Sequence, residues 1–70
     1  KMDDFDLGAL VKDHRKKAGL TQLELANLAG VGKTTVFDIE KNKETVRWNS
    51  LMAVLQVLNI KLEFKSPLTK

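Results

Sequence analysis

The chain has 70 residues, a formal net charge of +3, a pI near 9.4 and no cysteine. This length allows one domain with a small core. The lack of cysteine excludes disulfides and thiolate metal sites as supports, which leaves association with a second copy. No apolar run approaches the roughly 18 residues of a membrane span, and no signal-peptide pattern opens the chain, so we expect a soluble, cytoplasmic protein. The basic charge suits a polyanionic partner without identifying one.

The first expected helix covers about residues 7–18. Asp6 can cap its start and Gly19 can end it, and one of its faces carries Leu7, Leu10, Val11, His14 and Ala18. His14 is the only histidine, and no cysteine is available to complete a site with it. On that face we expect a partly buried, hydrogen-bonded core residue rather than a general base or a metal ligand.

The stretch from Gln22 to Lys41 has the spacing of two short helices joined by a tight turn. Thr21 and Glu24 form a capping box that starts the first of them, and Gly30 can take the positive φ that ends it. The apolar residues form a narrow stripe on each helix: Leu25, Ala26 and Ala29, then Val36 and Ile39. With the small Ala26 at the crossing and the apolar Val31 after the glycine, this is the helix-turn-helix pattern.

The second of these helices, at about residues 33–41, is expected to contact the bases of DNA. Its outer face and edges leave five candidate base contacts: Lys33, Thr34, Thr35, Phe37 and Asp38. Phe37 is either an apolar group that touches a base or an extra core residue. Asp38 either accepts a hydrogen bond from a cytosine amino group or repels phosphate and so discriminates between sequences.

Candidate phosphate contacts lie on both sides of this helix. Thr21 and Gln22 stand at the start of the preceding helix, where backbone N–H groups are suited to binding a phosphate. The polar turn that follows adds Lys41, Asn42, Lys43 and, further on, Arg47. The alternative is that Thr21 only caps its helix and that the other side chains are solvated.

Residues 30–35 also spell the end of a phosphate-binding P-loop, Gly-Val-Gly-Lys-Thr-Thr. The first glycine of that motif would fall at Asn27, no strand precedes it, and a nucleotide-binding sheet does not fit in 70 residues. One inward-facing histidine and no cysteine leave no set of nucleophile, base and oxyanion donors. We therefore expect neither an enzyme nor a cofactor nor a metal.

A fourth helix is expected at about residues 48–58, followed by a strand at 60–64. The helix is apolar on more than one face, and the strand alternates Ile60, Leu62 and Phe64 but cannot satisfy its own backbone groups. We therefore expect a mainly α homodimer in which two copies of the strand pair antiparallel, so that two reading helices face a palindrome. The expected interface residues are Trp48, Leu51, Leu55, Leu58, Ile60, Leu62 and Phe64.

The expected organisation is thus a single DNA-binding domain. A loose end covers residues 1–5, a helical core residues 6–58, the dimerising strand residues 60–64 and a tail residues 65–70.

Across residues 7–58 the sequence resembles the lambda-repressor-like (Xre-type, Cro/C1) DNA-binding domains. The residues that carry the resemblance are Arg15, Gly19-Leu20-Thr21-Gln22, Leu25-Ala26, Gly30-Val31, Val36 and Ile39-Glu40. The resemblance implies a four-helix fold, a structural salt bridge between Arg15 and Glu40, and a phosphate contact by Gln22. It implies base-reading positions at Lys33, Thr34, Phe37 and Asp38, where Phe37 departs from the family's usual small polar residue.

The expected strand takes the place of the family's usual fifth helix. In this arrangement the chain resembles the HipB-type antitoxins. That resemblance implies a repressor of its own operon that also binds a HipA-type kinase toxin. Two alternatives stay open. One is a phage-type or housekeeping repressor without a toxin partner. The other is a protein-interaction module that has kept the fold and lost DNA binding.

Overall fold

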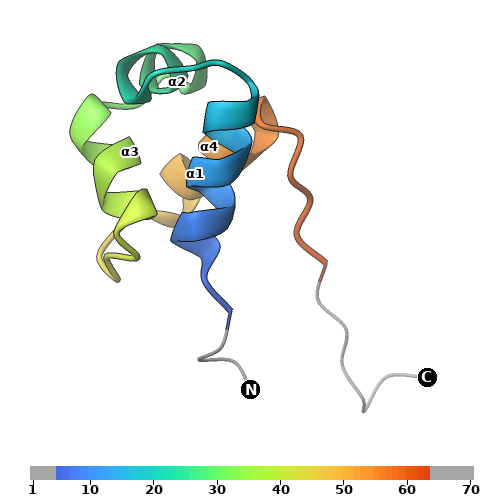
Figure 1. Ribbon diagram of the computed structural model, residues 1–70. Helices are drawn as coiled ribbons and strands as arrows, with labels where there is room; N and C mark the ends of the chain where they lie inside the picture. Colours follow the sequence, from blue (N-terminus) through green and yellow to red (C-terminus); the bar gives the residue numbers. More distant parts are fainter. Residues whose placement is uncertain (1–4, 64–70) are drawn as a thin grey trace.

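The computed structural model describes residues 5–63, which form four α-helices. Figure 1 shows α1 (Leu7–Lys17), α2 (Gln22–Ala29), α3 (Lys33–Glu40) and α4 (Trp48–Val57). The mainly α, four-helix fold expected from the sequence is confirmed, and each helix begins and ends within one residue of its expected bounds.

Local signals set these helix ends. The Asp6 side chain caps α1 by accepting a hydrogen bond from the backbone N–H of Ala9 at 2.8 Å. Thr21 and Glu24 form both bonds of the capping box at the start of α2. Gly30 ends α2 with φ 72°, in the left-handed region that favours glycine.

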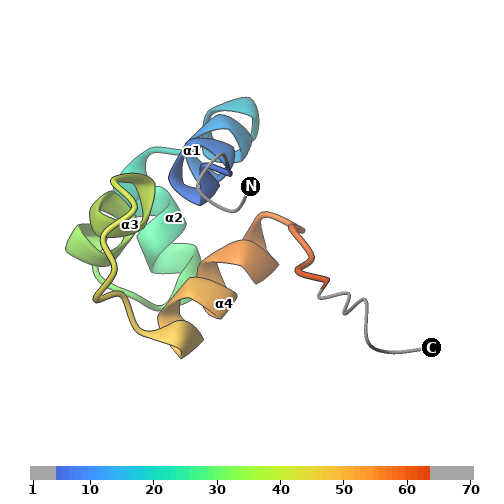
Figure 2. The same cartoon turned by 90° about the horizontal axis from the view of Figure 1, so that it is seen from below.

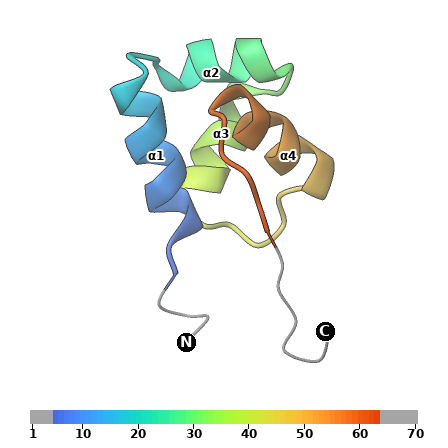
Figure 3. The same cartoon turned by 90° about the vertical axis from the view of Figure 1, so that its right-hand side faces the viewer.

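The core lies where the four helices meet. α2 crosses the ends of the other helices and packs on α3 and α4, while α1 packs on α3 (Figure 3). The buried apolar side chains are Val11, Leu25, Ala26, Val36, Ile39, Val54, Leu55 and Leu58.

Leu55 is fully buried and Leu58 is only 8% exposed, so placing these two residues in a dimer interface was wrong. The packing of α4 within a single chain already covers them.

The strand expected at residues 60–64 is absent from the part of the chain that the structure describes. After α4 the backbone turns at Asn59, with φ 59°, and residues 60–63 form an irregular segment (Figure 2). A lone extended segment has no neighbour to complete a hydrogen-bonded ladder, so nothing within one chain makes it a strand. Phe64, the last residue of the expected strand, lies outside the described residues.

The start of α1 lies directly against the end of α3. The backbone N–H of Gly8 donates to Asn42 Oδ1 at 2.8 Å, and Asn42 Nδ2 donates to Asp6 Oδ1 at 2.7 Å. Asn42 has φ 61°, a left-handed conformation that asparagine tolerates better than most residues. A Cβ on Gly8 would lie 2.5 Å from the carbonyl oxygen of Glu40. Glycine is therefore required at position 8 by the approach of two backbones.

Gly8→Ser tests this contact. We expect a loss of roughly 1–3 kcal/mol in the free energy of unfolding, because backbone atoms must move to admit the new side chain. Gly32→Ser is the matched control, since a Cβ there meets nothing closer than Thr35 Oγ1 at 4.0 Å and serine suits a helix N-cap. Urea denaturation measures both. Equal stability of the two variants would contradict the close approach.

Candidate nucleic-acid interface

α2, the turn and α3 form a helix-turn-helix unit (Figure 1). Ala26 is 1% exposed, and its small side chain lets the two helices approach each other. The backbone N–H of Val31 donates to the carbonyl oxygen of Ala26 at 3.0 Å, which closes the turn after Gly30. Val36 and Ile39 bury the inner face of α3. The outer face of α3 is thereby fixed by local geometry and by core packing together.

The outer face of α3 carries three of the five residues expected to contact bases. Lys33, Thr34 and Phe37 are exposed, whereas Thr35 and Asp38 are half-buried at the edges of the helix. Phe37 is 46% exposed, so it is not an additional core residue.

Phe37 lies among polar and charged neighbours. The ammonium nitrogen of Lys41 is 5.6 Å from the centroid of its ring, within the range of a cation–π contact. The side chains of Gln22, Lys33, Thr34 and Phe37 line a cavity of about 370 Å³. We call this cavity the α2–α3 notch. It lies between the start of α2 and the outer face of α3.

A buried ion pair joins α1 to the end of α3. Arg15 Nε donates to Glu40 Oε2 at 2.6 Å and Arg15 Nη2 donates to Oε1 at 3.1 Å, and the two side chains are 10% and 4% exposed. Arg15 Nη1 also donates to the carbonyl oxygen of Leu20 at 2.9 Å, in the connection between α1 and α2. The salt bridge implied by the family resemblance is present, and it holds three parts of the fold together.

Gln22 is attached to the same ion pair. Its Nε2 donates to Glu40 Oε1 at 3.1 Å, and because a carboxylate only accepts, the amide orientation is determined. Within residues 5–63, one Nε2 hydrogen and the side-chain oxygen of Gln22 remain available. Thr21 Oγ1 accepts the backbone N–H of Glu24 at 3.0 Å, so Thr21 does cap its helix. Its hydroxyl hydrogen is still free to donate to a phosphate.

The hydrogen bonds around Glu40 keep it charged. Burial alone would raise the pKa of its carboxyl, but the bonds from Arg15 and Gln22 outweigh burial and hold that pKa below its ordinary value. The hydrogen bond between Arg15 and Glu40 also raises the pKa of Arg15. The pair is therefore ionised throughout the neutral range.

Exposed cations follow α3. Lys41, Lys43 and Arg47 are all exposed, with Lys43 Nζ 3.9 Å from Asp38 Oδ2. Asn42, expected to contact phosphate, instead uses its Oδ1 and one Nδ2 hydrogen to join α1 to the turn after α3. The geometry supports a structural role for Asn42. The sequence signal for this junction is Gly8, since a glycine within a helical pattern often marks close packing.

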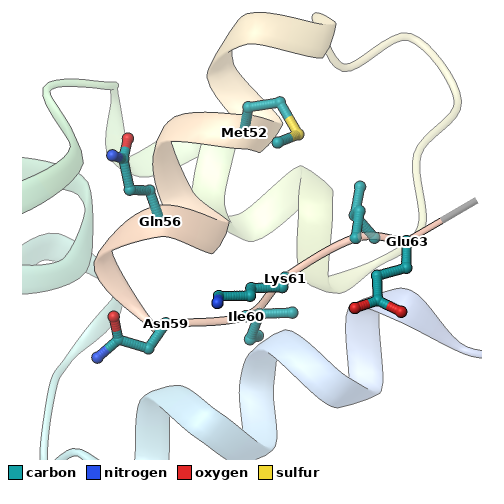
Figure 4. A pocket seen from close by; sticks show the side chains of 7 residues that line it. Met52, Gln56, Asn59, Ile60, Lys61 and Glu63 are labelled. Atoms are coloured by element: carbon teal, nitrogen blue, oxygen red, sulfur yellow. The ribbon is translucent and has the colours of Figure 1, made fainter.

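The remaining residues of the expected dimer interface lie around α4. Trp48 is 59% exposed, and Leu51, Ile60 and Leu62 are half-buried. A groove of about 750 Å³ lies between α4 and the segment after it. Its lining residues, seen in Figure 4, are Met52, Gln56, Asn59, Ile60, Lys61, Leu62 and Glu63. We call this groove the α4 groove. It shares no lining residue with the α2–α3 notch.

His14 is half-buried, with Nδ1 2.9 Å from the carbonyl oxygen of Leu10, to which it donates. Among residues 5–63, no group of three or more histidine, cysteine, aspartate or glutamate side chains is placed to hold a metal ion. In that same part of the chain, no helix is long and apolar enough to cross a membrane.

Comparison with known proteins agrees with this geometry. The family model described as Helix-turn-helix (HTH_3) matches residues 11–65. The chain belongs to the Xre-type helix-turn-helix family. It is accordingly a DNA-binding protein of the class that regulates transcription, as the sequence resemblance implied.

Relatives and solved structures extend the comparison. The chain is 40% identical over 62 residues to an uncharacterized HTH-type transcriptional regulator, y4mF, of Sinorhizobium fredii, covering 89% of this chain and 82% of the relative. It is 34% identical over 61 residues to the ImmF control region 10 kDa protein of Bacillus phage phi105, covering 87% and 68%. It also resembles a chain in a structure of a HipA-HipB-O2-O3 complex, with a TM-score of 0.76, 26% identity and coverage of 87% and 86%.

The stability of the protein should depend on pH through Glu40. Because its pKa is lower in the folded than in the unfolded chain, its contribution is complete above the unfolded value and is lost as the pH falls through the folded value. We expect the wild-type free energy of unfolding to fall in acid, and Glu40→Gln to reduce that slope. Urea titrations at a series of pH values measure it.

Asp6→Asn is the control for this measurement. The pKa of Asp6 is also lowered, chiefly by the hydrogen bond from Asn42, so this variant removes the Asp6 part of the slope and keeps the part due to Glu40. If the wild type and Glu40→Gln lost stability equally between neutral and acid pH, the ion pair would not be the titrating element.

Proposed function

We propose that the protein is a sequence-specific repressor that reads operator DNA with α3. The observation that carries the proposal is the exposure of Lys33, Thr34 and Phe37 on one face of a helix whose opposite face is buried in the core. A helix of this kind fits the major groove, where base edges present distinct patterns of donors, acceptors and methyl groups. Thr35 and Asp38, at the edges of the same helix, complete the proposed set of base contacts.

Phosphate contacts would fix the position of α3 in the groove. On one side stand Thr21 and Gln22 at the start of α2, and on the other the exposed Lys41, Lys43 and Arg47. With three to five such contacts per subunit, the binding constant of a dimer would fall with salt at a log–log slope of very roughly −5 to −9. Such a protein would act in the cytoplasm, where the DNA is.

The proposed repressor acts as a homodimer. The α4 groove carries the half-buried Ile60 and Leu62, and the same segment of a second copy would cover these apolar side chains. The two α3 helices would then face two half-sites of a palindrome.

We further propose that this repressor is the antitoxin of a HipBA-like operon, which binds a HipA-type kinase toxin and represses its own synthesis. Support comes from the similarity to a chain of the HipA-HipB-O2-O3 complex over most of both chains. Co-expression with the product of the neighbouring gene tests it. A stable complex with a kinase-like product supports the antitoxin role, and a neighbour that is no kinase, or does not bind, overturns it.

The similarity to the ImmF control region protein of a Bacillus phage favours a second candidate. In this case the chain is a phage-type repressor with no toxin partner. Both candidates share the same use of α3, so the gene neighbourhood and the co-expression result distinguish them.

Thr34→Ala tests the reading helix. Removing one hydroxyl from the outer face should weaken binding to the operator by about 5- to 10-fold, the effect of losing one hydrogen bond, and leave binding to unrelated DNA unchanged. Thr45→Ala is the matched control, because Thr45 is exposed outside α3. Fluorescence anisotropy with operator and scrambled duplexes gives the ratio of the two binding constants for each variant. An unchanged ratio for Thr34→Ala would remove this residue from the base contacts.

Leu62→Asp tests the dimer. A charge in the α4 groove should raise the dimer dissociation constant by at least 10-fold, because the carboxylate would be buried without a partner. Leu28→Asp is the control, since Leu28 is 62% exposed on α2 and outside the groove. Sedimentation equilibrium measures both variants, and circular dichroism verifies that each is folded. A folded Leu62→Asp protein with the wild-type dimer constant would contradict the proposed interface.

A further inference from the structure

We propose that the α2–α3 notch is a reading site for a single thymine, with the thymine methyl group against Phe37. This inference rests on the proposed function, because it concerns the way α3 reads a base. The notch is lined by Gln22, Lys33, Thr34 and Phe37. The residues that line this one cavity therefore include an aromatic residue, a lysine and a threonine.

The ring of Phe37 selects the methyl group. It is 46% exposed although the ammonium of Lys41 lies 5.6 Å from its centroid, so the cation leaves much of the ring uncovered. Apolar surface gains free energy only when it leaves water against another apolar group. Among the four bases of unmodified DNA, thymine alone presents a methyl group in the major groove. The ring therefore has one natural partner there.

The polar groups of the notch select the remainder of the base. Thymine carries the acceptor O4 next to its methyl group, and the Lys33 ammonium can only donate a hydrogen bond, whereas the Thr34 hydroxyl can donate or accept. A 5-methylcytosine would offer the same methyl group beside an amino donor, which an ammonium cannot accept. The apolar wall and the Lys33 ammonium together thus favour thymine over the methylated cytosine.

The remaining wall is held in place before DNA arrives. Gln22 Nε2 donates to Glu40 Oε1 at 3.1 Å, and Glu40 is itself held by two bonds from Arg15. A side chain fixed in this way loses little conformational freedom on binding, which favours affinity and discrimination. The buried ion pair therefore holds the Gln22 wall of the notch.

The test uses the tightest duplex that the wild-type protein selects from a random-sequence DNA pool. Each thymine of that duplex is replaced in turn by deoxyuridine, which removes only the methyl group. At one position in each half-site we expect about fourfold weaker binding, which corresponds to the ~0.8 kcal/mol of one buried carbon group. Replacing the same thymine by 5-methylcytosine, paired with guanine, should weaken binding further.

Three variants of the protein locate the effect. Phe37→Ala should bind thymine and deoxyuridine duplexes equally, whereas Phe37→Leu, which keeps an apolar side chain, should retain part of the difference. Lys43→Gln should weaken both duplexes alike and keep the fourfold difference, because its ammonium is expected on a phosphate. Circular dichroism verifies that the variants are folded.

The outcomes separate this inference from the proposed function. Selection of a specific duplex followed by no deoxyuridine effect, or by an equal effect in Phe37→Ala, overturns the thymine site and leaves the repressor intact. Equal binding at the 5-methylcytosine position overturns the choice of thymine. Failure to select any duplex overturns the proposed function itself, and the thymine site with it.

Discussion

The fold and the candidate interface both depend on the ion pair between Arg15 and Glu40. Charges this deeply buried are costly unless their hydrogen bonds are completed, and here the fork geometry, the Leu20 carbonyl and the Gln22 amide complete them. Removing one partner of such a pair typically costs about 3–5 kcal/mol. In a domain whose total stability is on the order of 5–15 kcal/mol, that is a large share.

The ion pair acts together with the close approach at Gly8. Glu40 is the last residue of α3, and its side chain bonds to Arg15 while its backbone oxygen faces Gly8. α1 therefore holds the end of α3 by a side-chain contact and a backbone contact. Lys33 and Thr34, at the opposite end of α3, are exposed. If α3 reads DNA as proposed, its fixed end means that it loses little freedom when it enters a groove.

The sequence predicted the parts of this structure that are set by near neighbours. Capping residues, left-handed glycines and apolar stripes act within one or two turns, so the bounds of the helices and the buried face of α3 followed from them. Contacts between distant residues were predicted less well. Leu55 and Leu58 were assigned to a second copy because their cover by other helices has no local signal. The bond between Asn42 and Gly8 spans 34 positions, so no local signal in the sequence indicated that Asn42 joins α1 to the turn after α3.

The proposed DNA-reading surface and the proposed dimer surface do not overlap. In Figures 1 and 2, α3 lies on one side of the molecule and the segment after α4 on the other. The exposed Phe37 belongs to the first surface, and the half-buried Ile60 and Leu62 belong to the second. A partner at the α4 groove would leave both reading helices of a dimer open to DNA. The spacing of the two half-sites would then be set by the geometry of α4 and its following segment, and the base preference by α3 alone.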